Sequence, residues 1–236
     1  MIAIEYPGYG LYENEYPCEK TILEDAALIL QHSIQNLKYK EENIILVGRS
    51  LGTGVAVAMG TIFPKLRGIV LISPFLSIRD VAEKLVGKLF AKVVPDIFRT
   101  YDHIQNLKTP VLFIHGVKDK LTPCTASKLL YERCNAPKMI NLSPYMDHHK
   151  IDLRNDIILP ILKFFVEKLN MEEYKLMYAC EDTTALSMLG SMDDAPSARS
   201  QLNKSNVEEC EGYSPASIEV YKKRIKLAEE YDLAFE

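Results

Sequence analysis

The sequence predicts an α/β protein in which a mostly parallel sheet is covered by helices on both faces. Three apolar runs of strand length, at residues 43–47, 68–72 and 110–114, alternate with longer amphipathic segments. Strands that are apolar on both faces are typical of parallel sheets buried between helices. The chain has 236 residues, of which 47% are hydrophobic and 25% charged, so it is large enough to bury a core of this kind.

Each predicted element rests on its hydrophobic period. Helices are predicted where apolar residues recur at helical spacing, over residues 21–37, 52–62, 78–92, 125–134 and 152–169. Strands are predicted where a short apolar run ends at a turn or at a polar residue, over residues 1–6, 43–47, 68–72, 110–114 and 139–142. The segment from Tyr6 to Gly10 closes the first of these strands, and we interpret it as a turn rather than as a functional site.

The body of the fold is expected to span residues 1–170, followed by an acidic tail over residues 171–236. The tail holds 14 acidic and 7 basic residues, whereas the whole chain carries a net charge of −4. Residues 183–217 are rich in Ser, Asp, Asn and Ala, and such a composition buries too little apolar surface to offset the entropy of ordering. We therefore expect a largely disordered tail with one helix near residues 217–231.

Composition excludes several classes of function. The net charge gives no electrostatic footprint for nucleic acid, no apolar run is long enough for a transmembrane helix, and the N-terminus lacks the pattern of a signal peptide. The five cysteines form no C-x-x-C pair, so neither a zinc site nor a redox pair is indicated; they are Cys18, Cys124, Cys134, Cys180 and Cys210. We expect an intracellular, cytoplasmic protein that needs no cofactor or metal.

A nucleophile motif lies between the strand predicted at 43–47 and the helix predicted at 52–62. Gly48-Arg49-Ser50-Leu51-Gly52 reads G-x-S-x-G, a pattern expected by chance in only about 0.03 copies at this composition. In this context it indicates a nucleophile elbow, a sharp turn that exposes the serine hydroxyl. Glycines are expected on both sides because larger residues would collide, and the helix N-terminus brings free N–H groups near the serine oxygen. Ser50 is the candidate nucleophile.

A serine nucleophile needs a base and a third group that orients the base. In proteins with this elbow, the acid and then the histidine follow the serine along the chain. Asp119 comes just after the strand at 110–114, and His148 comes after the next strand. Ligand sites in parallel sheets lie at the carboxyl ends of the strands, so both loops should converge on Ser50. His149 could be the base instead, because only one of two neighbours can point at Ser50.

Two other polar residues at strand ends are interpreted as structural. His115 precedes Gly116 at the end of the strand at 110–114, where packing explains it best. Ser73 follows the strand at 68–72, but it has no flanking glycines. Neither residue is assigned a role in chemistry.

The order and spacing of these motifs resemble the alpha/beta hydrolase domain-containing protein 17 family over about residues 1–168. The motifs are Tyr6-Pro7-Gly8-Tyr9-Gly10, Gly48-Arg49-Ser50-Leu51-Gly52-Thr53-Gly54, Ile72-Ser73-Pro74-Phe75, His115-Gly116-Val117-Lys118-Asp119 and the histidine loop. The resemblance implies the alpha/beta-hydrolase fold and a serine hydrolase that acts as a protein S-palmitoyl thioesterase, removing palmitate from cysteine. Its substrate would be an acylated protein or a small ester.

The resemblance also implies a role for each site residue. Ser50 would be the nucleophile, Asp119 the orienting acid, and His148 the base. The backbone N–H of Leu51 would donate to the oxyanion. His148 is preferred to His149 because the family's loop has its histidine first, then a small polar residue, and a little later an acidic one.

The family's domain begins well before the position that matches Met1. The resemblance therefore implies that three strands, a helix, a His-Gly-Asn type loop with a second oxyanion donor, and a lipidated cysteine-rich segment belong upstream. Membrane association is expected only through that segment. Losing one oxyanion donor typically costs about 10²–10³ in rate, so the chain as given is expected to be impaired. It is either a truncated form of a normal enzyme or a degenerate remnant.

Two other functions stay open. The chain could be a non-catalytic binding protein that keeps part of a hydrolase shell, or a peptidase similar to serine aminopeptidases. The insert between Phe75 and Pro110 is short and forms a small lid. Its apolar residues either line an acyl groove or pack on the core; they are Val81, Leu85, Leu89, Phe90, Val93 and Val94.

Overall fold

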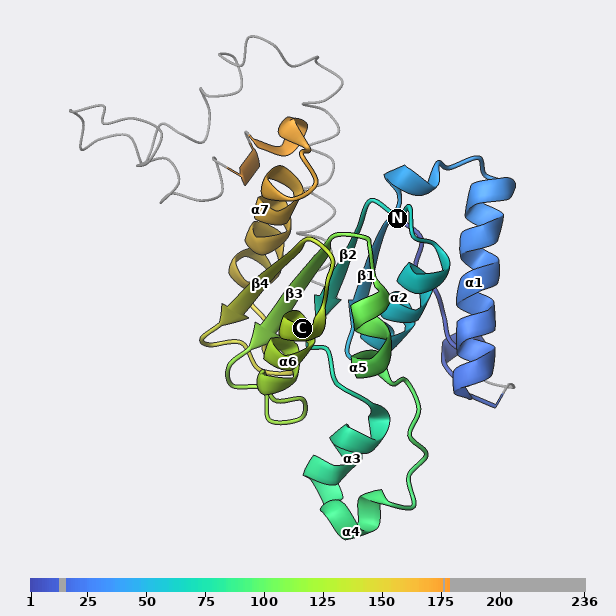
Figure 1. Cartoon of the computed structure of the whole chain (residues 1–236), viewed down its shortest axis with the longest axis vertical. Coiled ribbons are helices and arrows are strands. Elements are labelled where there is room, and N and C mark those ends of the chain that lie inside the picture. The colour runs from blue at the N-terminus through green and yellow to red at the C-terminus, as the bar shows by residue number, and fades with distance from the viewer. Residues whose placement is uncertain (13–15, 176, 179–236) are drawn as a thin grey trace, which may run out of the picture. The chain divides into compact units, whose positions relative to one another are not determined.

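Four parallel strands, hydrogen-bonded in the order β1-β2-β3-β4, form the sheet of the described part of the chain (Figure 1). They are β1 (Ile45–Arg49), β2 (Gly68–Ile72), β3 (Val111–Gly116) and β4 (Lys138–Ser143). The computed structural model describes residues 1–12, 16–175 and 177–178. The helix predicted near 217–231 and nearly all of the predicted acidic tail lie outside the described residues. Within them, the predicted parallel sheet is confirmed.

The helices follow the predicted order, with three differences, one of which is the short helix α5, which was not predicted. They are α1 (Glu19–Gln35), α2 (Leu51–Ile62), α3 (Ile78–Val86), α4 (Lys88–Ala91), α5 (Thr100–His103), α6 (Thr125–Arg133) and α7 (Leu159–Glu167). The single helix predicted over 78–92 is wrong, because Gly87 at φ +85° separates α3 from α4. The helix predicted over 152–169 starts with a π-helical turn, Leu153–Ile158, because Pro160 has no N–H to continue an α-helical ladder backward.

Helices cover both faces of the sheet, as the two-sided apolar strands require. Ile69 and Leu71 of β2 pack on one face with apolar residues of α2 and α6. Val70 and Ile72 pack on the opposite face with α7, which lies across the sheet from α2 and α6 in Figure 1. Helix α1 packs on α2 through a third apolar cluster.

Residues 1–6 form no strand, contrary to the prediction. A strand needs a neighbour with which to share hydrogen bonds, and β1 pairs only with β2 in the described part of the chain. Ile4 and Tyr6 instead pack on the cluster formed by α1 and α2. The side chain of Val47 on β1 is consequently 60% exposed. The turn predicted from Tyr6 to Gly10 is present, with the Tyr9 N–H donating to the Tyr6 carbonyl at 3.1 Å.

Candidate active site

Ser50 lies in a strained turn between β1 and α2. Its backbone has φ +49° and ψ −118°, a conformation that is costly for a residue with a side chain and that occurs preferentially at functional sites. The Ser50 N–H donates to the carbonyl of Ile72 at 2.9 Å, which extends the β1–β2 ladder to the serine itself. The Ser50 carbonyl accepts from both the N–H and the hydroxyl of Thr53. Together, these bonds hold the turn in its strained shape.

The two glycines of the motif are not equivalent. A Cβ atom on Gly48 would lie 2.3 Å from the carbonyl oxygen of Gly52, so only glycine fits there. A Cβ atom on Gly52 would meet Tyr6 Oη at 3.4 Å as its nearest neighbour among the described residues. The collision expected from the sequence on both sides of the serine therefore holds for Gly48 and not for Gly52.

Ser73 occupies the corresponding turn after β2 but differs from Ser50 in access. It also has a positive φ, +51°, yet its side chain is buried and its hydroxyl has no hydrogen-bond partner among the described residues. A buried hydroxyl cannot meet a substrate without rearrangement. The interpretation of Ser73 as structural agrees with this placement.

The loops after β3 and β4 bring Asp119 and His148 into contact. His148 Nδ1 lies 2.8 Å from Asp119 Oδ2, and the two side chains are 9% and 0% exposed. Asp119 Oδ1 accepts the backbone N–H groups of Leu121 and Thr122 at 3.0 and 2.9 Å. An ionised carboxylate can only accept, so Nδ1 of His148 is the donor and Nε2 is left as the acceptor. This is the tautomer that a general base needs.

The surroundings of Asp119 keep it ionised. Burial raises the pKa of its carboxyl group, but the backbone N–H of Thr122 and the contact with His148 outweigh that effect, so the pKa lies below its ordinary value. The hydroxyl of Thr122 is a fourth donor to the carboxylate, at 3.0 Å, besides the two backbone N–H groups and His148 Nδ1. Asp119 is thus a fixed negative charge beside the imidazole.

A tight turn decides which of the two adjacent histidines faces Asp119. Asp147 Oδ1 accepts the N–H groups of His149 and Lys150 at 2.8 and 2.7 Å. The turn leaves His148 buried and His149 exposed, with their rings edge to face at 5.3 Å. Of the pair, the geometry therefore favours His148 as the partner of Asp119.

Arg49 links the serine turn to the histidine loop. Its guanidinium donates a hydrogen bond to the carbonyl oxygen of His148, so the residue directly before Ser50 holds the backbone of the candidate base. Among the described residues, no hydrogen bond joins the Ser50 hydroxyl to either imidazole. Such bonds are often long without substrate. No sequence pattern indicates a role for Arg49, because it occupies an unrestricted position of the motif.

His115 is buried beneath the Asp119 loop. Its Nε2 faces the carbonyl oxygen of Thr122, which can only accept, so Nε2 carries the proton and Nδ1 accepts from the Ser127 hydroxyl at 2.7 Å. Burial lowers the pKa of His115 below its ordinary value of 6.5, despite the hydrogen bond to Thr122. This neutral, hydrogen-bonded residue ties the loop that carries Asp119 to α6.

The lowered pKa of His115 predicts a pH dependence of stability. The unfolded chain binds a proton at this histidine below about pH 6.5, whereas the folded chain does not until a lower pH. The contribution of His115 to the free energy of unfolding should therefore be complete above pH 6.5. It should decrease as the pH falls toward the pKa of the folded state, by at most about 1.4 kcal/mol per pH unit. Urea unfolding of the wild type and of His115→Gln between pH 8 and pH 5 measures this. Equal pH slopes for the two chains would contradict the prediction.

A cavity of about 310 Å³ opens beside the serine. It is lined by the serine turn, by Val47 of the exposed edge of β1, and by Ile4, Tyr6 and Tyr9 of the N-terminal segment. Burial raises the pKa of Tyr6, so its phenol stays protonated and remains a donor at neutral pH. The cavity therefore combines apolar walls with polar groups next to Ser50. In the part of the chain that the structure describes, no helix is both long and apolar enough to cross a bilayer.

Comparison with known proteins places these features among hydrolases. Residues 3–102 match the family model described as serine aminopeptidase, S33. The chain is 32% identical to alpha/beta hydrolase domain-containing protein WAV2 of Arabidopsis thaliana over 58% of its own length and 49% of that protein. It is 31% identical to human alpha/beta hydrolase domain-containing protein 17C over 57% of its length and 39% of that protein. The chain thus spans about half or less of these relatives.

A solved structure shows the same fold. The alpha-beta hydrolase from Vibrio vulnificus superposes with a TM-score of 0.52 at 18% identity, covering 62% of this chain and 57% of the other. At this level of identity the likeness extends to the fold alone. The predicted alpha/beta-hydrolase fold is confirmed.

Proposed function

We propose that the chain is a serine hydrolase that cleaves esters or thioesters through an acyl-enzyme, because it has the alpha/beta-hydrolase fold and is similar in sequence to alpha/beta hydrolase domain-containing protein 17C. The hydrogen bond between Asp119 and His148 carries the proposal. It supports an oriented base on a loop that Arg49 links to the serine turn. The proposed setting is the reducing cytoplasm, where free thiols such as the exposed Cys18 persist.

In the proposed mechanism, His148 takes the proton of the Ser50 hydroxyl through Nε2. Ser50 Oγ then attacks the acyl carbonyl, and the tetrahedral oxygen accepts the backbone N–H of Leu51 at the start of α2. Asp119 holds the imidazole in place and stabilises its charged form. The leaving alcohol or thiol takes the proton from the imidazolium, and water releases the acid from Ser50 by the same steps in reverse order.

The finer proposal is that the substrate is an S-palmitoylated protein. It rests on the resemblance to the domain-containing 17 family, in which the motifs around Ser50, Asp119 and His148 occur in the same order. The cavity beside Ser50 has apolar side chains in its lining, Ile4, Val47 and Leu51, that an acyl chain can contact. A thioester also has a better leaving group than an amide, so it demands less of a site with one assigned oxyanion donor.

A peptidase with serine aminopeptidase-like specificity is the second candidate. The family model that matches residues 3–102 carries that description, which is the observation in its favour. The same nucleophile, base and acid would serve both reactions, so the two candidates differ only in the substrate that the cavity accepts. A panel of a palmitoyl thioester, a short p-nitrophenyl ester and an aminoacyl p-nitroanilide separates them.

A fluorophosphonate probe tests the proposed nucleophile. The probe labels a serine only where a base activates it, so we expect labelling of the wild type and none of Ser50→Ala. Ser73→Ala is the matched control, because Ser73 has the same residue type and a similar backbone strain but is buried. We expect Ser73→Ala to be labelled like the wild type. Equal labelling of the wild type and Ser50→Ala, or no labelling of the wild type, would reject the proposal.

A further inference from the structure

Helices α3 and α4 present an apolar surface that their own fold does not cover. Figure 1 shows them extending from the sheet as a separate projection, which we call the α3–α4 projection and define as residues 77–94. The alternative in which its apolar residues pack on the core describes only some of them. Val81 packs on the core, whereas five others are 53–85% exposed; they are Leu85, Val86, Leu89, Phe90 and Val93. Soluble proteins rarely expose large apolar side chains in such a cluster unless it meets a partner.

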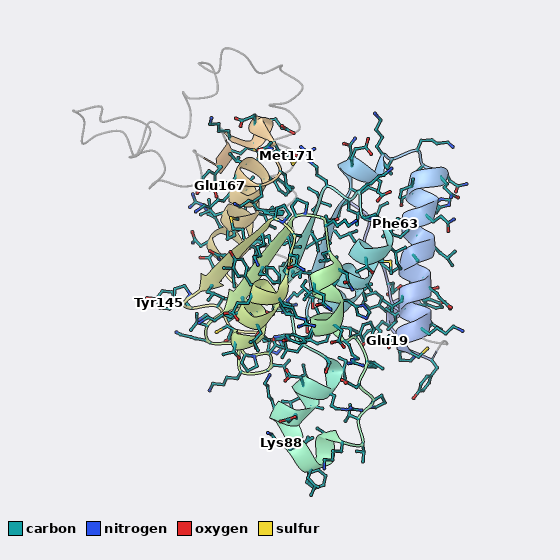
Figure 2. The ribbon with its side chains drawn as sticks, in the orientation of Figure 1. Glu19, Phe63, Lys88, Tyr145, Glu167 and Met171 are labelled. Atoms are coloured by element: carbon teal, nitrogen blue, oxygen red, sulfur yellow. The ribbon has the colours of Figure 1, made fainter. Side chains whose placement is uncertain are left out.

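Basic residues are interleaved with this apolar cluster. The α3–α4 projection holds four basic and two acidic residues, although the chain as a whole has a net charge of −4. Lys84 and Lys88 pair with Asp80 and Glu83 on the same projection, at 2.6 and 3.6 Å. Lys92 adds a charge that forms no ion pair with another described residue, and Lys88 lies near the far end of the projection in Figure 2. Apolar side chains flanked by lysine are typical of surfaces that bind the headgroup region of anionic membranes.

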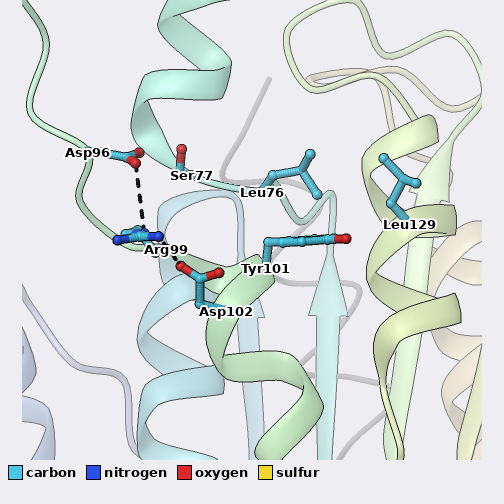
Figure 3. A pocket seen from close by; sticks show the side chains of 7 residues that line it. All are labelled: Leu76, Ser77, Asp96, Arg99, Tyr101, Asp102 and Leu129. Carbon is cyan, nitrogen blue, oxygen red and sulfur yellow. Dashed lines mark ion pairs between the residues drawn. The ribbon is translucent and has the colours of Figure 1, made fainter.

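Ion pairs join the chain segments at the base of the projection. Arg99 lies 3.8 Å from Asp96, and it also pairs with Asp102 at the start of α5 (Figure 3). Arg79 of α3 lies 3.6 Å from the same Asp96 and donates to the carbonyl of Val94 at 3.0 Å. Helix α3 is thus bonded to the segment that leaves the projection, at Val94 and Asp96. Most of the exposed apolar side chains lie on the two short helices and not on an irregular loop.

The projection extends from the edge of the sheet that carries the candidate active site. It follows the carboxyl end of β2, and the arrows of β1 and β2 point toward it in Figure 1. Ser50 follows the carboxyl end of the neighbouring strand β1. A surface that contacts the projection therefore lies on the same side of the sheet as Ser50.

We propose that the α3–α4 projection gives the chain a means of membrane association besides the upstream segment expected from the sequence: it is a docking surface that inserts Leu89 and Phe90 among the headgroups of an anionic bilayer. Docking in this way brings the candidate site to the surface where acylated proteins are anchored. The use of docking to reach acylated proteins rests on the proposed function, but the binding of the projection to the membrane does not. The lysines supply the attraction to anionic lipid, and the exposed apolar side chains supply the insertion.

A single tryptophan reports on insertion, because the chain has none of its own. We expect the emission of Phe90→Trp to shift to the blue on adding vesicles of phosphatidylcholine with about a quarter phosphatidylserine, and to shift less with phosphatidylcholine alone or in high salt. Leu28→Trp on α1, an equally exposed apolar position at 62%, is the matched control and should not shift. No shift for Phe90→Trp, or the same shift for both, would overturn the proposal.

Cosedimentation with the same vesicles gives a second test. Leu89→Ser with Phe90→Ser should weaken binding at least about tenfold, and Lys88→Glu with Lys92→Glu should weaken it several-fold. These positions are exposed, so the variants should fold and should hydrolyse a short soluble ester like the wild type. If Leu89→Ser with Phe90→Ser instead converts a dimer of this chain to monomers and leaves vesicle binding unchanged, the surface is an interface between copies and the proposal is wrong. Vesicle binding by Ser50→Ala separates docking from catalysis, because failure of the hydrolase proposal leaves that binding intact.

Discussion

Asp119→Asn should lower the turnover of a short p-nitrophenyl ester by about 10⁴-fold and leave the fold intact. Asparagine has the same shape, and its amide oxygen can still accept the N–H groups of Leu121 and Thr122. Its NH₂ group takes the place of Asp119 Oδ2, which accepts from His148 Nδ1 at 2.8 Å in the wild type. A donor therefore faces Nδ1 in the variant. The imidazole then keeps its proton on Nε2, where it cannot accept one from Ser50. The measurement is kcat, together with circular dichroism to show that the variant is folded.

Asp147→Asn is the matched control for this prediction. Asp147 lies in the same histidine loop and accepts two backbone N–H groups, but its hydrogen bonds go to the turn and not to an imidazole nitrogen. Its asparagine variant keeps both acceptor bonds, so turnover should stay within a few-fold of the wild type. A value for Asp119→Asn within tenfold of the wild type, or an equal loss in both variants, would mean that the contact between Asp119 and His148 does not serve the chemistry.

The sequence predicted the central strands well because their signal is local. Residues 68–72 are apolar without interruption, and β2 covers that range because both of its faces are buried. Residues 1–6 are also apolar, but whether they form a strand depends on a hydrogen-bonding neighbour, which their own composition does not encode. Gly87 was overlooked for a related reason. The apolar period continues across it, so the break between α3 and α4 shows only in its positive φ.

The sequence predicts which loops carry the residues of the candidate site, but not the contacts between those residues. The carboxyl ends of parallel strands meet at one edge, so the positions of Ser50, Asp119 and His148 followed from the strands before them. The choice between His148 and His149 depended on the turn made by Asp147, which the residues alone did not decide. The hydrogen bond from Arg49 to the carbonyl of His148 joins residues 99 positions apart, and no pattern in the sequence predicts it.

Gly48→Ala should lower the free energy of unfolding by about 3 kcal/mol or more and displace the serine turn. The added Cβ would lie 2.3 Å from the carbonyl oxygen of Gly52 and 2.9 Å from the Cα of Thr53, both backbone atoms of the first turn of α2. Side chains can swing away from a collision, but this one requires the helix to move off the end of β1. Urea unfolding monitored by circular dichroism measures the loss, and fluorophosphonate labelling reports on the turn.

Gly52→Ala separates this steric effect from a general need for glycine in the motif. Its Cβ would meet only the phenol oxygen of Tyr6 at 3.4 Å among the described residues, a contact of ordinary length. Alanine also favours the helix over glycine by about 1 kcal/mol, so the variant should be as stable as the wild type or slightly more stable. A loss of stability at Gly52 equal to that at Gly48 would show that the close approach of α2 to β1 does not explain the need for glycine at Gly48.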